Sequence, residues 1–180
     1  MNIVLIGYRC SGKTEVGKIL AWKLGMEFID TDRLIEEDTG CSIESIISEK
    51  GWDHFRNIER KMIEEVSERD NLAIATGGGV VMDGNNVKNL NRNGFIVWLK
   101  GNAEVLKERM EKEQRSGNIR PSLTGVDPIE EINQVLDVRT PLYRQTGNLM
   151  VDTSLLSIEE VADAVMKNLP RGIHVSRIEN

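Results

Sequence analysis

Short apolar runs alternate along the chain with segments whose apolar residues recur every three or four positions. Residues 2–6, "NIVLI", form a run that ends at Gly7, as is typical of a strand buried on both faces of a parallel sheet. Four more strands are predicted at "MEFID" (26–30), "LAIAT" (72–76), "GFIVWL" (94–99) and "LMVD" (149–152).

The segments between these runs have helical periodicity. Val16, Ile19, Leu20 and Leu24 follow the first strand at helical spacing, and Gly25 ends that helix. Further helices are predicted over 42–69, broken in two near Gly51, and near 84–91, 103–113, 129–143 and 157–169. The alternation predicts an α/β fold, a three-layer sandwich with helices on both faces of a central five-stranded parallel sheet.

One polar segment interrupts the alternation. Residues 112–127, "KEQRSGNIRPSLTGVD", contain two glycines and a proline, and a loop of this length in a compact domain is usually functional or disordered. We expect a mobile lid over about 112–125. The prediction is a single domain over 1–169, with acceptor-binding helices over about 31–69, and the tail 170–180 stays unassigned.

Composition narrows the class of protein. The 180 residues carry 23 basic and 29 acidic side chains, a net charge of −6, which disfavours non-specific binding to nucleic acid. No apolar stretch approaches the roughly 20 residues that a membrane helix needs, so no membrane partner is expected. The chain has two cysteines, Cys10 and Cys41, from which no disulfide framework can be predicted. Reduced thiols in a cytoplasmic protein are the expectation. The protein is also expected to be a monomer.

The first strand is followed by a phosphate-binding motif. "GYRCSGKT", residues 7–14, matches G-x-x-x-x-G-K-[ST] between a strand and a helix, which is the context of a P-loop. Lys13 is expected to reach the β- and γ-phosphates of ATP, and the Thr14 hydroxyl to ligate Mg²⁺. A chance glycine turn is the alternative. The residues expected to contact ATP here are Gly7, Cys10, Ser11, Gly12, Lys13, Thr14 and Glu15.

Cys10 stands where many P-loops have a further glycine. If that position needs a positive φ, a cysteine there is strained. A reactive thiol and a tolerated substitution are both compatible with this residue.

Two carboxylates end the second strand. Asp30 and Asp32 alternate along it, so an extended chain would point one toward the P-loop metal and the other into the pocket. The alternative is an Asx cap on the following helix, "TDRLIEED".

Two arginines border predicted core positions. Arg56 lies one step off an apolar stripe, with Glu59 three residues on to orient it; a surface ion pair is the alternative. Arg139 falls on the stripe formed by Ile132, Leu136 and Tyr143, where a guanidinium needs an anionic partner, either a ligand or a protein carboxylate.

The third strand ends in "TGGGVV", residues 76–81. Three glycines in a row let a ligand approach backbone N–H groups closely. The dinucleotide-binding fingerprint is absent, because the glycine spacing is wrong and no acidic residue ends the next strand.

Taken together, these motifs resemble those of the shikimate kinases, small P-loop kinases of aromatic amino-acid biosynthesis. The resemblance runs from residue 2 to about 168 and rests on "GYRCSGKT", "DTD", "FRNIE", "TGGG", "RPSL" and "RTPLY". It implies ATP-dependent phosphorylation of the shikimate 3-hydroxyl, giving shikimate 3-phosphate and ADP, in the pathway to chorismate. The expected partners are therefore ATP, with Mg²⁺, and shikimate.

The resemblance also implies a role for each matching residue. Asp30 supports the metal through water, and Asp32 binds the shikimate hydroxyls and accepts the proton of the reacting one. Arg56 and Arg139 hold the shikimate carboxylate. The resemblance further implies that backbone N–H groups of Gly77, Gly78 and Gly79 bind the ring hydroxyls. It implies that Arg120 of the lid binds ATP phosphate, and that Arg109 and the loop after Asp152 flank adenine. Two departures from the family are Cys10 and a lid that is a few residues longer.

Other functions remain compatible with a P-loop. One is another small-molecule kinase, such as a gluconate or nucleoside monophosphate kinase. The other is a catalytically silent nucleotide-binding module, against which Lys13, Thr14 and Asp32 argue.

Overall fold

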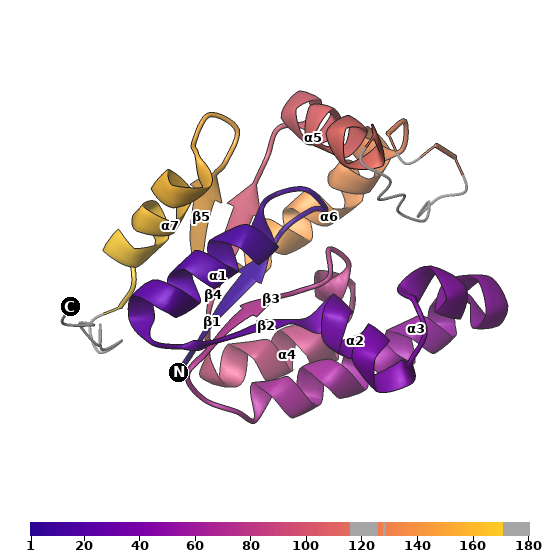
Figure 1. Cartoon of the computed structure of the whole chain (residues 1–180), viewed down its shortest axis with the longest axis horizontal. Coiled ribbons are helices and arrows are strands. Elements are labelled where there is room, and N and C mark those ends of the chain that lie inside the picture. The colour runs from indigo at the N-terminus through magenta and orange to yellow at the C-terminus, as the bar shows by residue number, and fades with distance from the viewer. Residues whose placement is uncertain (116–125, 128, 171–180) are drawn as a thin grey trace.

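The five predicted strands form one parallel sheet, and helices cover both of its faces (Figure 1). A computed structural model describes residues 1–115, 126–127 and 129–170. The strands are β1 (Asn2–Ile6), β2 (Glu27–Asp30), β3 (Leu72–Ala75), β4 (Gly94–Lys100) and β5 (Leu149–Asp152), in the order β2-β3-β1-β4-β5. The helices are α1 (Lys13–Leu24), α2 (Thr31–Thr39), α3 (Ile43–Ser67), the short 3₁₀ helix η1 (Val80–Met82), α4 (Gly84–Asn93), α5 (Ala103–Arg115), α6 (Ile132–Thr146) and α7 (Ile158–Lys167).

All strand pairs in the sheet are parallel, as the alternation of elements predicts. β1 lies at the centre, and each of its residues is buried. The side chains of β1 alternate between the two faces, so Val4 and Ile6 face one core and Ile3 and Leu5 face the other.

The two cores are built by different helices. One lies between the sheet and α2, α3, α4 and α6, and the other between the sheet and α1 and α7. A smaller cluster packs α5 and α6 against Tyr8 beside the P-loop. The layers are therefore those of the predicted three-layer sandwich.

The predicted break in the long helix is confirmed. The chain is helical on both sides of Gly51 in α3, but Gly51 itself has φ 81° and ψ 169°, which no helical residue adopts. Glycine tolerates this conformation because it has no Cβ. α3 is therefore two helical segments that meet at a kink.

Part of the predicted lid lies in α5. Residues 112–115 form the last turn of that helix, whereas 116–125 lie outside the described residues, as does the tail after Pro170. Within the described part of the chain, no helix combines the length and the hydropathy of a membrane span.

Candidate functional site

The strand order brings three loops together at one edge of the sheet. β3 lies between β1 and β2, so the glycine turn after β3 is flanked by the P-loop after β1 and by Asp30 at the end of β2. The carboxyl ends of all three strands share this edge, as expected for the ligand site of such a sheet.

The P-loop leads directly into α1. Gly12 caps the helix with φ 91°, a left-handed conformation that favours glycine. The Lys13 ammonium donates hydrogen bonds to the carbonyls of Gly7 (2.9 Å) and Tyr8 (2.8 Å). The lysine thus lies across the loop, where the helix N-terminus and loop N–H groups favour phosphate.

Cys10 has φ 60°, as its position in the motif suggested. A non-glycine residue in this region is strained. Its carbonyl accepts a hydrogen bond from Arg109 Nη1 (3.3 Å), and the same guanidinium donates to the Thr153 hydroxyl (3.1 Å) and carbonyl (2.7 Å). Arg109 therefore joins α5 to the P-loop and to the loop after β5, and the last of these is the loop expected, with Arg109, beside adenine.

Thr14 and Asp30 meet at the start of α1. The Thr14 hydroxyl donates to Asp30 Oδ2 (2.8 Å), while Asp30 Oδ1 accepts the backbone N–H of Asp32 (3.1 Å) and Arg33 (3.4 Å). The Asx-cap alternative is therefore correct for Asp30, which both ends β2 and caps α2.

The predicted alternation of Asp30 and Asp32 along a strand is wrong. Asp32 lies in the first turn of α2, because the chain becomes helical directly after Asp30. Its carboxylate nevertheless faces the glycine turn, since a Cβ on Gly77 would come within 2.7 Å of Asp32 Oδ1. Glu15, by contrast, directs its carboxylate to Lys18 (2.7 Å) on the exposed side of α1, and its contact with ATP stays a prediction.

Arg56 and Glu59 form a pair on α3. Arg56 Nη1 donates to Glu59 Oε2 (2.7 Å), and the Glu59 side chain is only 1% exposed while that of Arg56 is 24% exposed. Burial raises the pKa of the Glu59 carboxyl above its ordinary value, against the opposing effect of Arg56. Glu59 Oε1 has no hydrogen-bond partner among the described residues. The pair is partly buried and is not the surface ion pair considered from the sequence.

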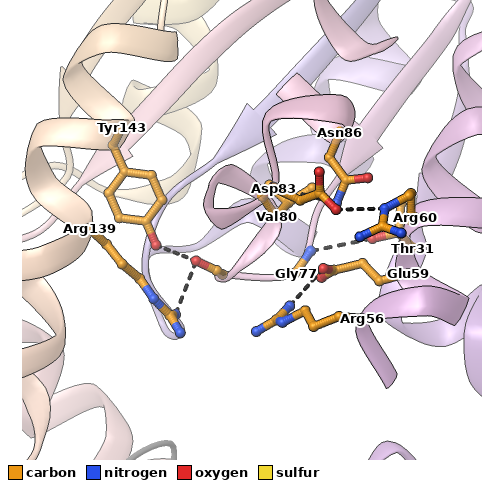
Figure 2. Close-up of polar contacts among 11 residues, drawn as sticks. Thr31, Arg56, Glu59, Arg60, Gly77, Val80, Asp83, Asn86, Arg139 and Tyr143 are labelled. Carbon is orange, nitrogen blue, oxygen red and sulfur yellow. Dashed lines mark hydrogen bonds and ion pairs between the residues drawn. The ribbon is translucent and has the colours of Figure 1, made fainter. Parts of the chain in front are cut away.

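Arg139 and Tyr143 reach the glycine turn from the opposite side. Both project from α6 and donate to the carbonyl of Gly78, Arg139 at 3.1 Å (Figure 2). Burial raises the pKa of Tyr143 to about 12, so its hydroxyl stays a donor at neutral pH. Arg139 is 8% exposed, and no carboxylate of the described residues forms an ion pair with it.

The three glycines make room for these side chains. A Cβ on Gly79 would lie 2.8 Å from Arg56 Cζ, one on Gly78 would lie 3.6 Å from Arg139 Nη1, and one on Gly77 would lie 3.0 Å from Glu59 Oε1. Figure 2 shows Arg56 and Arg139 approaching the same turn from α3 and α6. The glycines thus admit protein side chains to the turn, in addition to the ligand contact expected from the sequence.

The N–H groups of the turn are not equivalent. The Gly77 N–H donates to the Thr31 hydroxyl (3.3 Å), and its expected contact with a ring hydroxyl stays a prediction. Among the described residues, the N–H groups of Gly78 and Gly79 have no hydrogen-bond partner. These two groups are available to a ligand.

Most of the predicted site residues therefore lie around one edge of the sheet. Arg120 is outside the described residues. The sequence analysis did not identify the polar role of Tyr143, because an aromatic residue on an apolar stripe is indistinguishable from a core residue. The buried Ser11 hydroxyl, which has no hydrogen-bond partner among the described residues, is a further polar group of the P-loop.

Comparison with known proteins agrees with this geometry. The family model described as shikimate kinase matches residues 9–170. Shikimate kinase of Thermodesulfovibrio yellowstonii is 41% identical over 170 residues, which span 94% of this chain and 95% of the relative. A shikimate kinase structure from Acinetobacter baumannii, in complex with shikimate, superposes with a TM-score of 0.85 and 32% identity, covering 92% of this chain and 90% of that one.

More distant structures share the fold alone. A gluconokinase from Sinorhizobium meliloti superposes with a TM-score of 0.57 at 18% identity, covering 92% of this chain and 89% of that one. Since the family model and the curated relatives span nearly the whole chain at much higher identity, the chain belongs to the shikimate kinase family.

Proposed function

We propose that this protein transfers the γ-phosphoryl group of ATP to the 3-hydroxyl of shikimate, giving shikimate 3-phosphate and ADP. One observation carries the proposal: a carboxylate, two guanidinium groups and two unpartnered N–H groups surround the glycine turn beside the P-loop. An acceptor that carries hydroxyls and a carboxylate on one ring matches these groups.

The arginines are suited to hold the carboxylate of the acceptor. Arg139 is nearly buried and donates to the Gly78 carbonyl through Nη1, and no carboxylate of the described residues forms an ion pair with it. Arg56 is oriented by Glu59, and its guanidinium lies against Gly79. Guanidinium groups pair with carboxylates through parallel hydrogen bonds, which fixes the orientation of the ring.

Asp32 is suited to act on the hydroxyl that reacts. Its Oδ1 lies against Gly77 in the glycine turn. There it can accept a hydrogen bond from the attacking hydroxyl, orient its oxygen toward the γ-phosphate and take its proton as the new P–O bond forms.

The nucleotide side fits an Mg²⁺ complex of ATP. The Thr14 hydroxyl and the Asp30 carboxylate are hard oxygen donors 2.8 Å apart. Among the described residues, no cluster of three or more His, Cys, Asp or Glu side chains could hold a metal by itself, so the remaining ligands would be phosphate and water. When bound with ATP, Mg²⁺ supplies charge neutralisation at the transferring phosphoryl group.

Lys13 completes the phosphate site. Its ammonium lies at the loop carbonyls and would exchange these contacts for the phosphates. By the family resemblance, Arg120 would add a second positive charge.

An ATP-consumption assay tests the proposal. The expected result is Mg²⁺-dependent ADP release with shikimate, little release without acceptor, and none from Lys13→Ala, which removes the phosphate-binding ammonium. Release with gluconate but not with shikimate would show a sugar-acid kinase. Binding of ATP without turnover on any acceptor would show a silent nucleotide-binding module.

A further inference from the structure

A cavity of about 190 Å³ lies at the carboxyl end of β4, between α5 and α6. It adjoins the site described above through Tyr8 of the P-loop and through Tyr143, whose hydroxyl donates to the Gly78 carbonyl. Its principal wall residues are Tyr8, Trp98, Leu106, Leu136, Thr140 and Tyr143.

The walls are mostly aromatic and aliphatic. Trp98 and Tyr143 are stacked with their ring centroids 5.9 Å apart, and Leu106 is fully buried. The Tyr143 hydroxyl already donates to the Gly78 carbonyl, so its proton is not available to an occupant of the cavity.

The size of the cavity limits what it can hold. An engineered protein cavity of about 150 Å³ with apolar walls binds benzene. A cavity of about 190 Å³ therefore accommodates one six-membered ring with a small substituent, and it is too small for typical drug-sized ligands.

The rim of the cavity is more polar than its walls. Leu136 and Thr140 are half-buried, so the cavity reaches the surface between these residues of α6 and the half-buried Lys100. The Lys100 ammonium is paired with Asp152 at 3.1 Å. The hydroxyl of Tyr8, in the wall, is buried and has no partner among the described residues.

We propose that this cavity binds a single-ring aromatic molecule with one uncharged hydrogen-bonding substituent, of the phenol class. The ring would pack against Trp98 and Tyr143, in the offset or edge-to-face arrangements that aromatic pairs prefer. The substituent would lie toward Thr140 at the rim.

The position of this site connects it to both substrate sites. The wall includes α5, which carries Arg109, and α6, which carries Arg139. Tyr143 links the cavity directly to Gly78 through its hydroxyl. An occupant therefore contacts the elements that position the nucleotide and acceptor groups.

Fluorescence of Trp98 provides the test. Phenol would be titrated into the full chain carrying Trp22→Phe and Trp52→Phe, so that the only remaining tryptophan is the one in the cavity wall. The expected result is a saturable change in emission with one site per chain. In the same background, Thr140→Phe fills the cavity and should weaken the apparent Kd by at least about tenfold.

Two further variants make the result decisive. Val138→Phe places the same ring on the exposed side of α6, away from the cavity, and should leave the Kd unchanged. Leu136→Phe fills the cavity from another wall position and decides the question if Thr140→Phe does not fold. A linear, unsaturable response to phenol, or a saturable one that survives both filling substitutions, would overturn the proposal.

Discussion

Arg139 places a positive charge where only 8% of the residue is exposed. Among the described residues its hydrogen-bond partner is the Gly78 carbonyl, a neutral group. A buried charge without an opposite charge is unfavourable. The carboxylate of the proposed acceptor would supply that opposite charge, which makes the residue sensitive to conservative substitution.

We expect Arg139→Lys to raise the KM for shikimate while leaving the KM for ATP nearly unchanged. An ammonium cannot make the planar two-bond contact with a carboxylate. Loss of one charge-assisted pair costs about 1.5–3 kcal/mol, or roughly 10- to 150-fold in affinity. Steady-state kinetics measure the effect, with Arg144→Lys on the exposed side of α6 as control. An unchanged shikimate KM would indicate a structural role.

The two aspartates predict different defects. Asp32→Asn removes the proton acceptor beside the turn and should lower kcat by about 10²- to 10⁴-fold with ATP binding retained. Asp30→Asn disturbs the Thr14 contact and the cap of α2, so it should raise the Mg²⁺ concentration needed for half-maximal rate. Rates measured over a series of Mg²⁺ concentrations distinguish the two, and exchanged phenotypes would contradict the assignment.

Glu59 predicts a pH-dependent contribution to stability. Its raised pKa means that the folded protein binds this proton more tightly than the unfolded chain does. The stabilisation is therefore present below the ordinary Glu pKa of 4.5 and is lost as the pH rises through the raised value.

The Glu59→Gln variant isolates this effect. The difference in unfolding free energy, wild type minus variant, should decrease as the pH rises from below 4.5 toward neutrality. Urea unfolding at several pH values measures it. A difference that is constant over this range, or that increases with pH, would show that the Arg56 charge outweighs burial.

At the scale of elements, the glycine turn between β3 and η1 is crowded by side chains of other elements. Side chains from α2, α3 and α6 all approach it, and each of the three glycines faces one of them. Gly79 has φ −100°, so an alanine there is acceptable to the backbone and conflicts only with Arg56.

We expect Gly79→Ala to displace the Arg56 guanidinium and raise the shikimate KM at least about tenfold, with the KM for ATP little changed, because the P-loop is not touched. Gly84→Ala is the matched control, since a Cβ there meets no atom within 4 Å. Kinetics of the two variants, with thermal unfolding as a check on folding, provide the measurement. Equal effects of both substitutions would mean that the turn is not crowded by Arg56.

At the scale of the whole molecule, the net charge of −6 opposes self-association at low ionic strength. We expect a monomer, and the cytoplasmic location expected from the sequence stays a prediction. Sedimentation velocity over a range of protein concentrations tests the first point. A concentration-dependent shift to twice the mass would contradict it.

Much of this architecture was predictable from local patterns. Apolar runs and three- to four-residue periodicity report which residues are buried, so all five strands, the main helices and the break at Gly51 were identified. The P-loop was recognisable because Gly7, Gly12, Lys13 and Thr14 lie at fixed spacing within eight residues of one loop. Arg139 was identifiable because a charge on an apolar stripe requires a partner.

Other features depended on which segments meet in space. Contacts between distant segments decided that β3 lies between β1 and β2 and that the Thr31 hydroxyl accepts the Gly77 N–H. Sequence spacing describes one element at a time, and it carries no information on which side chain fills the space beside a glycine of another element. The roles of Tyr143 and of the cavity at β4 therefore became visible only in the folded protein, where α5 and α6 close over the end of the sheet.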